Sequence, residues 1–284
     1  MAPMLEAQDR RYHFRQPDSV PYPKAIMTTI QVGKLEDLIP AGRHALAHFG
    51  KTSFWWRGQA RSDWPLVPKV FRCAEFGGPL EHCSVYEFFL RAPTRHAQLP
   101  ATDRVLEWLF LMQHYGAPTR LLDWTESAAI ATYFATLDGH DDQPGALWAL
   151  SAPILNETHG LGRGTLMPWK PDVLHLAAEA AKPNPARVEK VLGIRGRETD
   201  VRMSVQLCAF TLHGTPAPLE SLSSSEDYLM KFEIPAATKA QLRITLDAFL
   251  GIRATTLFPD LGSLGHHLAN TTWVVPGVAP SGAG

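Results

Sequence analysis

Two short blocks that mix polar and aromatic residues constrain this chain more than any other feature. FWWRGQ runs from Phe54 to Gln59, and QHYGAPTRLLDWT runs from Gln113 to Thr125. Their polar and charged side chains are Arg57, Gln59, Gln113, His114, Thr119, Arg120 and Asp123. A buried guanidinium without a partner costs several kcal/mol, so such groups must be paired or must serve a ligand. The pattern is typical of a polar pocket and also of a buried ion-pair network.

The remaining composition describes an ordinary globular chain. With 284 residues and 45% hydrophobic content, it can bury a substantial core, and we expect a single domain over residues 26–275. Residues 1–25 are charged, contain several prolines and lack periodicity, which predicts an extended arm. The glycine- and proline-rich residues 276–284 predict a disordered tail.

Charge, cysteine usage and hydropathy narrow the function classes. The formal charge of −1 gives no strong signal for nucleic acid, and no apolar run is long enough to cross a membrane. Cys73, Cys83 and Cys208 are too scattered for a disulfide framework or a zinc ribbon, so we expect a cytoplasmic protein. Glu6 and Asp9 stand where a secretory peptide would be apolar. We expect no metal site, because no HExxH or EF-hand pattern occurs.

Periodicity predicts a mixture of strands and helices. Strands are expected over residues 28–32, 53–59, 145–151, 201–214 and 228–235, and helices over 35–49, 104–116, 126–139, 171–181, 236–251 and 257–269. Another helix is expected to begin at Leu80 or at Ser84. Residues 156–171 predict a loop, and 183–200 a short helix with turns. Without strict alternation, the class is α+β, a mixed, largely antiparallel sheet flanked by helices.

The second block is expected to connect two helices. Gly116 suits the end of the preceding helix, and Pro118 prevents that helix from continuing. Thr125 suits the N-cap of the following helix.

The blocks resemble the FRG-domain family, which takes its name from a Phe/Tyr-Arg-Gly motif. Here that motif is Trp56-Arg57-Gly58, and the family's HYGxPTRLLDW(T/S) block matches residues 114–125 with Ala117 in the variable position. The resemblance continues through AAIATYFA and later through SVQLCAF and TLFPDL, so it covers roughly residues 26–269.

Three residues of the first block are candidate ligand contacts. Arg57 could hold a phosphate or carboxylate with two parallel donors, while Gly58 lets a ligand approach the backbone. The alternative for Arg57 is an internal salt bridge, for example to Asp123. Gln59 could bind an amide or a base edge, or it could satisfy buried backbone.

The second block supplies further candidates. Gln113 and Thr119 are possible ligand contacts, and His114 is a possible general base or a histidine placed at a helix end. Arg120 and Asp123 are close enough along the chain to form a local structural pair, and the alternative for both is a catalytic role.

Two hypotheses for function follow. The order of Arg57, Thr119 and Gln206 resembles the order of parts in ADP-ribosyltransferases, which implies a nucleotide-recognising domain, with NAD or another nucleotide as the ligand and His114 and Gln206 as catalytic candidates. These enzymes generally carry a late-strand glutamate where this chain has Gln206, which favours binding over transfer. The alternative is a non-catalytic sensing or protein-interaction module in prokaryotic stress or phage defence. The sequence identifies no protein partner.

Overall fold

One mixed sheet organises the molecule. The computed structural model describes residues 26–72, 79–137, 139–186, 188–198 and 200–270. Within these ranges seven strands form a single sheet in the order β1-β7-β4-β2-β3-β6-β5. The strands are β1 (Ile26–Gln31), β2 (Trp55–Gln59), β3 (Leu121–Thr125), β4 (Gly145–Leu150), β5 (Val191–Ile194), β6 (Cys208–His213) and β7 (Leu229–Ile234). Only β1 and β7 pair in parallel, and the other neighbours are antiparallel. The predicted α+β class is therefore confirmed.

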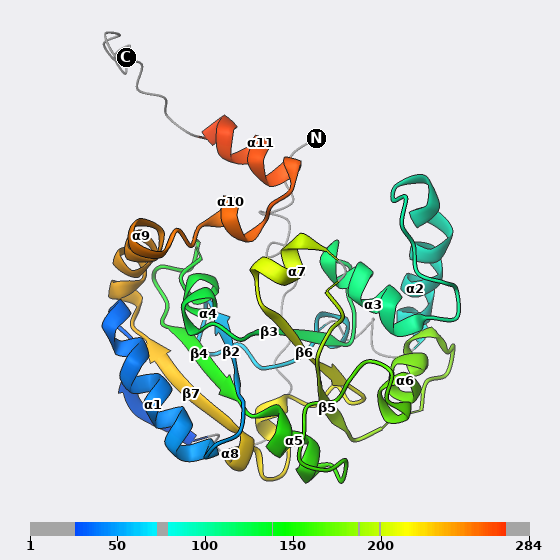
Figure 1. Cartoon of the computed structure of the whole chain (residues 1–284), viewed down its shortest axis with the longest axis horizontal. Helices are drawn as coiled ribbons and strands as arrows, with labels where there is room; N and C mark the ends of the chain where they lie inside the picture. The colour runs from blue at the N-terminus through cyan, green and yellow to red at the C-terminus, as the bar shows by residue number, and fades with distance from the viewer. Residues whose placement is uncertain (1–25, 73–78, 138, 187, 199, 271–284) are drawn as a thin grey trace.

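Helices cover both halves of this sheet (Figure 1). They are α1 (Leu38–Phe49), α2 (Pro79–Arg91), α3 (Val105–His114), α4 (Ala128–Ala135), α5 (Ala152–Thr158), α6 (Pro171–Ala178), α7 (Val201–Val205), α8 (Ser225–Tyr228), α9 (Lys239–Leu250), α10 (Ala254–Leu257) and α11 (Leu261–Asn270). In the view of Figure 1, α4 lies over β2 and β4, whereas α3, α6 and α7 surround β3, β6 and β5. Helix α2 begins at Pro79, so the earlier of the two predicted starts is correct.

The strands separate two sides of the core. Along β2, Trp55 packs with Trp124 and Trp148, while its neighbour Trp56 packs on the other side with Phe232. This alternation is the period-2 pattern of a strand buried on both faces. The central strand β4 is buried at every position, which explains why its sequence GALWAL contains no charge.

Gly58 is required because helix α4 crosses β2 at very short range. A Cβ atom added to Gly58 would lie 1.8 Å from the main-chain oxygen of Ala131 and 2.6 Å from the main-chain nitrogen of Ala135. Both obstacles are backbone, which cannot rotate away. The glycine of the Trp-Arg-Gly motif therefore has a packing role, whether or not it also contacts a ligand.

The second block differs from the prediction of a simple connection between helices. Helix α3 ends at His114 and Gly116 takes a positive φ of 74°, as expected, but residues 121–125 then form β3. The N-cap of α4 is Ser127, whose side chain accepts a hydrogen bond from the N–H of Ile130, and not Thr125. The strand was missed because aspartate is depleted in strands and Asp123 stands at its centre, so only the pairing with β2 and β6 assigns it.

Three later predictions also need correction. Residues 201–205 form α7, so the strand predicted over 201–214 is confined to β6 and Gln206 lies outside it. Strand β5 replaces the short helix predicted within 183–200. Helix α5 occupies the start of the predicted loop at 156–171. Short apolar runs such as Val191–Ile194 fit helix and strand equally, and only their pairing with β6 decides between them.

Several expectations fall on residues outside the described ranges. These are the N-terminal arm, the tail at 276–284 and the surroundings of Cys73. Among the residues that are described, no helix combines the length and the apolar character needed to cross a membrane.

Replacing Gly58 by alanine tests the close approach of α4. We expect Gly58→Ala to lower the free energy of unfolding by at least about 3 kcal/mol, because backbone must shift to admit the methyl group. Gly42→Ala on α1 is the matched control: its Cβ would meet nothing within 4 Å, so it should be neutral or stabilising by up to about 1 kcal/mol. Urea unfolding at 25 °C measures both, and equal midpoints would contradict the packing role.

Candidate functional site

The two signature blocks meet where neighbouring strands β2 and β3 separate. Strand β2 pairs with β4 along five residues but with β3 at a single pair, Trp56 with Thr125. If the register continued, Gly58 would stand opposite Asp123. The ladder ends before that point. We call this place the β2–β3 separation.

Arg57 occupies the β2–β3 separation. Its Nη1 donates a hydrogen bond of 2.7 Å to the main-chain oxygen of Asp123, which takes the place of a missing ladder bond. Its Nε is buried and has no hydrogen-bond partner among the described residues. Burial lowers the pKa of Arg57 to about 10, with Asp123 opposing and Arg72 adding to this effect. The guanidinium thus stays charged at neutral pH but is poorly compensated, although part of the side chain still reaches solvent.

The other candidates of the first block are engaged within the protein. Gln59 is 4% exposed, accepts a 2.6 Å hydrogen bond from the indole Nε1 of Trp148, and donates to the main-chain oxygen of Pro65. Gly58 packs against α4. The structural alternative for Gln59 is therefore the one that its contacts favour.

Three side chains of the second block form a hydrogen-bonded relay. The buried Thr119 hydroxyl accepts from the N–H of Leu121 and donates to Oε1 of Gln113 at 2.5 Å. This contact orients the Gln113 amide so that its Nε2 donates to Oδ2 of Asp123 at 2.7 Å. Asp123 is exposed although both strand neighbours, Leu122 and Trp124, are buried. The relay holds one carboxylate oxygen and leaves the aspartate open to solvent.

His114 lies beside this relay, at the last residue of α3. Its Nδ1 is 3.1 Å from Oδ2 of Asp200, a distance that suits an ion pair although the direction is poor for a hydrogen bond. Arg202 donates to the main-chain oxygen of His114 at 2.9 Å and stacks over the ring of Phe258. Burial raises the pKa of Asp200, but contacts with His114 and the N–H of Met203 outweigh it, so the net pKa is lowered.

Gln206 lies between α7 and β6, shortly after Asp200 and Arg202 along the chain. Its Nε2 donates to the main-chain oxygen of Leu257 at 2.9 Å, and its Oε1 lies 3.8 Å from the Sγ of Cys208. Burial and the charge of Asp123 raise the pKa of Cys208 to about 12, so this thiol is not an activated nucleophile. The amide of Gln206 joins α10 to the end of α7.

The expected pair of Arg120 with Asp123 is wrong. In extended chain, residues three apart point to opposite faces, and Arg120 instead pairs with Glu81 on α2. Two hydrogen bonds join them, from Nε at 2.9 Å and from Nη2 at 2.5 Å, and both side chains are almost completely buried. Glu81 lies far away along the chain in a region without a motif, so no local pattern could have indicated it.

A comparison with protein families identifies the domain. Residues 52–143 match the FRG domain. The chain carries an FRG domain. The matched range contains β2, α3, β3 and α4, and hence both signature blocks and the whole β2–β3 separation. A search of curated proteins and a search of solved structures gave no match.

The matched range contains only β2 and β3 of the seven described strands, and the sheet is completed by strands outside it: β1, β4, β5, β6 and β7. The segment before β6 also contributes side chains that sequence reasoning missed, namely Asp200 and Arg202 beside His114. The Asp200 side chain caps α7 by accepting from the N–H of Met203, a role that an Asp before a helix could have suggested.

His213, a buried histidine on β6, is linked through Thr211 to Trp124 of the second signature block. The indole Nε1 of Trp124 donates to Oγ1 of Thr211, which contacts Nε2 of His213 at 2.9 Å. The other ring nitrogen, His213 Nδ1, is buried and has no hydrogen-bond partner within the described ranges. Burial, with a smaller contribution from Arg57 and Arg120, lowers the pKa of His213 to about 3. The imidazole is therefore neutral at pH 7.

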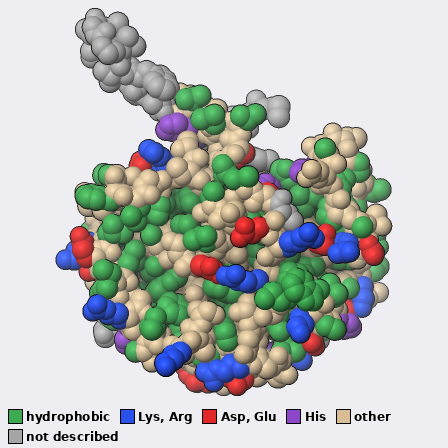
Figure 2. Space-filling model, viewed as in Figure 1, with side chains coloured by type: hydrophobic (Ala, Val, Ile, Leu, Met, Phe, Trp, Pro, Cys, Tyr) green, Lys and Arg blue, Asp and Glu red, His purple; other side chains and the backbone are tan. Residues whose placement is uncertain are grey.

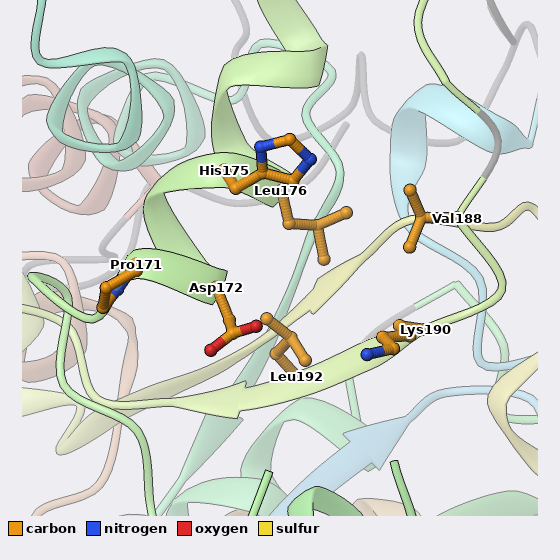
Figure 3. A pocket seen from close by; sticks show the side chains of 7 residues that line it. All are labelled: Pro171, Asp172, His175, Leu176, Val188, Lys190 and Leu192. Atoms are coloured by element: carbon orange, nitrogen blue, oxygen red, sulfur yellow. The ribbon is translucent and has the colours of Figure 1, made fainter. Parts of the chain in front are cut away.

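A surface pocket elsewhere does not involve the FRG signature. It has a volume of about 390 Å³ and opens beside the edge strand β5, where Asp172, His175 and Lys190 surround Leu176 and Leu192 (Figure 3). Strands β3 and β6 separate β5 from β2 in the sheet. The three polar side chains are exposed, which is the ordinary state of solvated charges.

Charge on the viewed face is mixed. Figure 2 shows acidic and basic side chains next to one another near the centre of the face on which α4 and α7 lie. Among the described residues, no group of three or more His, Cys, Asp or Glu side chains is arranged to hold a metal ion.

The pairing of Arg120 can be measured by double-mutant cycles. We expect Arg120→Met and Glu81→Gln each to lower the free energy of unfolding by about 3 to 5 kcal/mol, since each leaves a buried charge without its partner. Their combination should cost much less than the sum. Arg120→Met with Asp123→Asn should be additive within about 0.5 kcal/mol. Coupling between Arg120 and Asp123 in urea unfolding would restore the pair expected from the sequence.

The neutral state of His213 predicts acid sensitivity. Its folded pKa lies below the unfolded value of about 6.5, so the unfolded chain takes up a proton first and stability falls as the pH drops below about 6.5. This residue should account for about 2 kcal/mol of the loss between pH 7 and pH 5. The loss should shrink by that amount in His213→Gln but persist in His175→Gln, whose side chain is exposed on α6. An unchanged pH dependence in His213→Gln would refute the assignment.

Proposed function

We propose that this FRG-domain protein is a nucleotide-recognising domain whose ligand places an anionic group against Arg57. One observation carries the proposal: at the β2–β3 separation, a guanidinium has a buried Nε without a partner. Among the described residues, no carboxylate forms an ion pair with Arg57. Its one acceptor is a neutral main-chain oxygen, that of Asp123.

The electrostatics favour an anion at this place. Burial already lowers the pKa of Arg57, and Arg72 adds positive charge nearby. Lys69, from the same segment as Arg72, donates to the main-chain oxygen of Gly116 inside the second signature block. A phosphate at the solvent-accessible part of the Arg57 side chain would offset its charge, and the planar guanidinium can offer donors in a geometry that suits phosphate oxygens.

Recognition without turnover is favoured over transfer. The ADP-ribosyltransferase analogy depends on Arg57, Thr119 and Gln206, but the Thr119 hydroxyl is fully buried within the relay and Gln206 is bound to Leu257. Neither side chain is available to a substrate in this arrangement. The proposal assigns no catalytic role to His114 either. It describes a module that binds a nucleotide without converting it.

The proposal is tested by thermal shift against NAD, ADP-ribose, ATP and GTP. At a hundred times its dissociation constant, a bound nucleotide should stabilise the protein by about 2.7 kcal/mol and raise Tm by roughly 5 to 10 °C. We expect Arg57→Gln to abolish the shift while remaining folded. Arg61→Gln, which removes an exposed pair with Asp63 close to the same strand, should keep it.

Two results would contradict the proposal. One is the absence of a shift with every nucleotide at millimolar concentration. The other is an equal shift in Arg57→Gln and the parent protein. If the protein released nicotinamide from NAD and this release required Arg57, the protein would be a transferase and not a recognition domain.

A further inference from the structure

Asp123 is an unusual residue for its position. Aspartate is depleted in strands because its short charged side chain fits a pleated, packed surface poorly. Yet Asp123 stands in the middle of β3, with β2 and β6 as neighbours and with buried residues on both sides along the chain. Its side chain is exposed, so the sheet is left uncovered at this point.

The carboxylate is oriented from one side only. Thr119 fixes the amide of Gln113, and Gln113 donates to Oδ2 of Asp123. Within the described part of the chain, Oδ1 accepts no such hydrogen bond. Gln113 supplies one hydrogen bond, and the negative charge of Asp123 also offsets part of the burial cost of Arg57, so the relay leaves one carboxylate oxygen for a further donor. The relay holds one oxygen still and presents the other to solvent.

The position relative to Arg57 defines the chemistry. Arg57 Nη1 binds the main-chain oxygen of the same aspartate, and the charge of Asp123 acts on Arg57, so the guanidinium and the carboxylate belong to one site. An anion-binding group next to a hydrogen-bond acceptor matches a ligand with a phosphate close to hydroxyl groups. Carboxylates bind the ribose hydroxyl in this way in dinucleotide-binding folds.

We infer that Asp123 binds the ribose hydroxyls of the ligand, so that the site selects ribonucleotides over deoxyribonucleotides. This inference rests on the proposed function and adds the sugar specificity. Thr119, whose hydroxyl is buried and engaged, acts as a positioning residue behind Asp123. Asp123 itself contacts the ribose.

The test compares ATP with 2′-deoxy-ATP and 3′-deoxy-ATP, and GTP with 2′-deoxy-GTP, by isothermal titration calorimetry on the full chain. Loss of a hydroxyl bonded to a charged acceptor should weaken binding by about tenfold or more. Asp123→Asn keeps an oxygen for the Gln113 contact but removes the charge, and should reduce the preference for ribose to less than about threefold. Asp172→Asn, an exposed carboxylate on α6, should keep the full preference.

The outcomes separate the two proposals. Equal affinity for ribose and deoxyribose forms would overturn the inference about Asp123 while leaving nucleotide recognition intact. The inference is also overturned if Asp123→Asn weakens both forms equally, since that is the behaviour of a purely structural residue. No binding of any nucleotide would overturn both proposals together.

Discussion

The rest of the structure depends on how the main chain is satisfied where β2 and β3 part in the middle of the sheet. Buried main-chain oxygens must be paired, and the ladder between these strands ends after one residue pair. Arg57 solves this problem by donating a side-chain hydrogen bond to Asp123. The guanidinium thereby lies within the sheet, where burial lowers its pKa and no residue in the described part of the chain accepts a hydrogen bond from its Nε. Arg57 thus has a structural role in the sheet and is also the residue to which we assign the proposed ligand contact.

Close packing on one side of β2 explains why the motif has its present form. Helix α4 approaches so closely that only glycine fits at position 58, and the next residue, Gln59, points to the other face and holds Trp148. The Trp-Arg-Gly-Gln order therefore satisfies three demands: a core aromatic, a charge between strands, and a helix contact. A ligand need not be invoked for Gly58 or Gln59. Within this motif, the buried side-chain atom that has no hydrogen-bond partner among the described residues is Arg57 Nε.

The sequence predicted local features well and distant partners poorly. The strand at the first block, the core helix α3 and the glycine that ends α9 follow from periodicity and capping within a few residues. The strand β3 and the pairing of Arg120 do not. Leu-Leu-Asp-Trp-Thr is assigned by its neighbours β2 and β6, and Glu81 meets Arg120 only because α2 packs there. Both depend on contacts between segments that are distant along the chain, which no local pattern encodes.

The division of charges within the signature follows from the alternation of side chains along β3. Arg120 points into the interior directly before the strand and is fully paired with Glu81. Asp123, three residues later, falls on the opposite side and is exposed, held only through Gln113. A strand's period of two therefore converts neighbouring charges in the sequence into one structural residue and one accessible residue. The Arg57 guanidinium and the Asp123 carboxylate thereby place opposite charges on the two strands that separate, and these are the charges that the proposed nucleotide would contact.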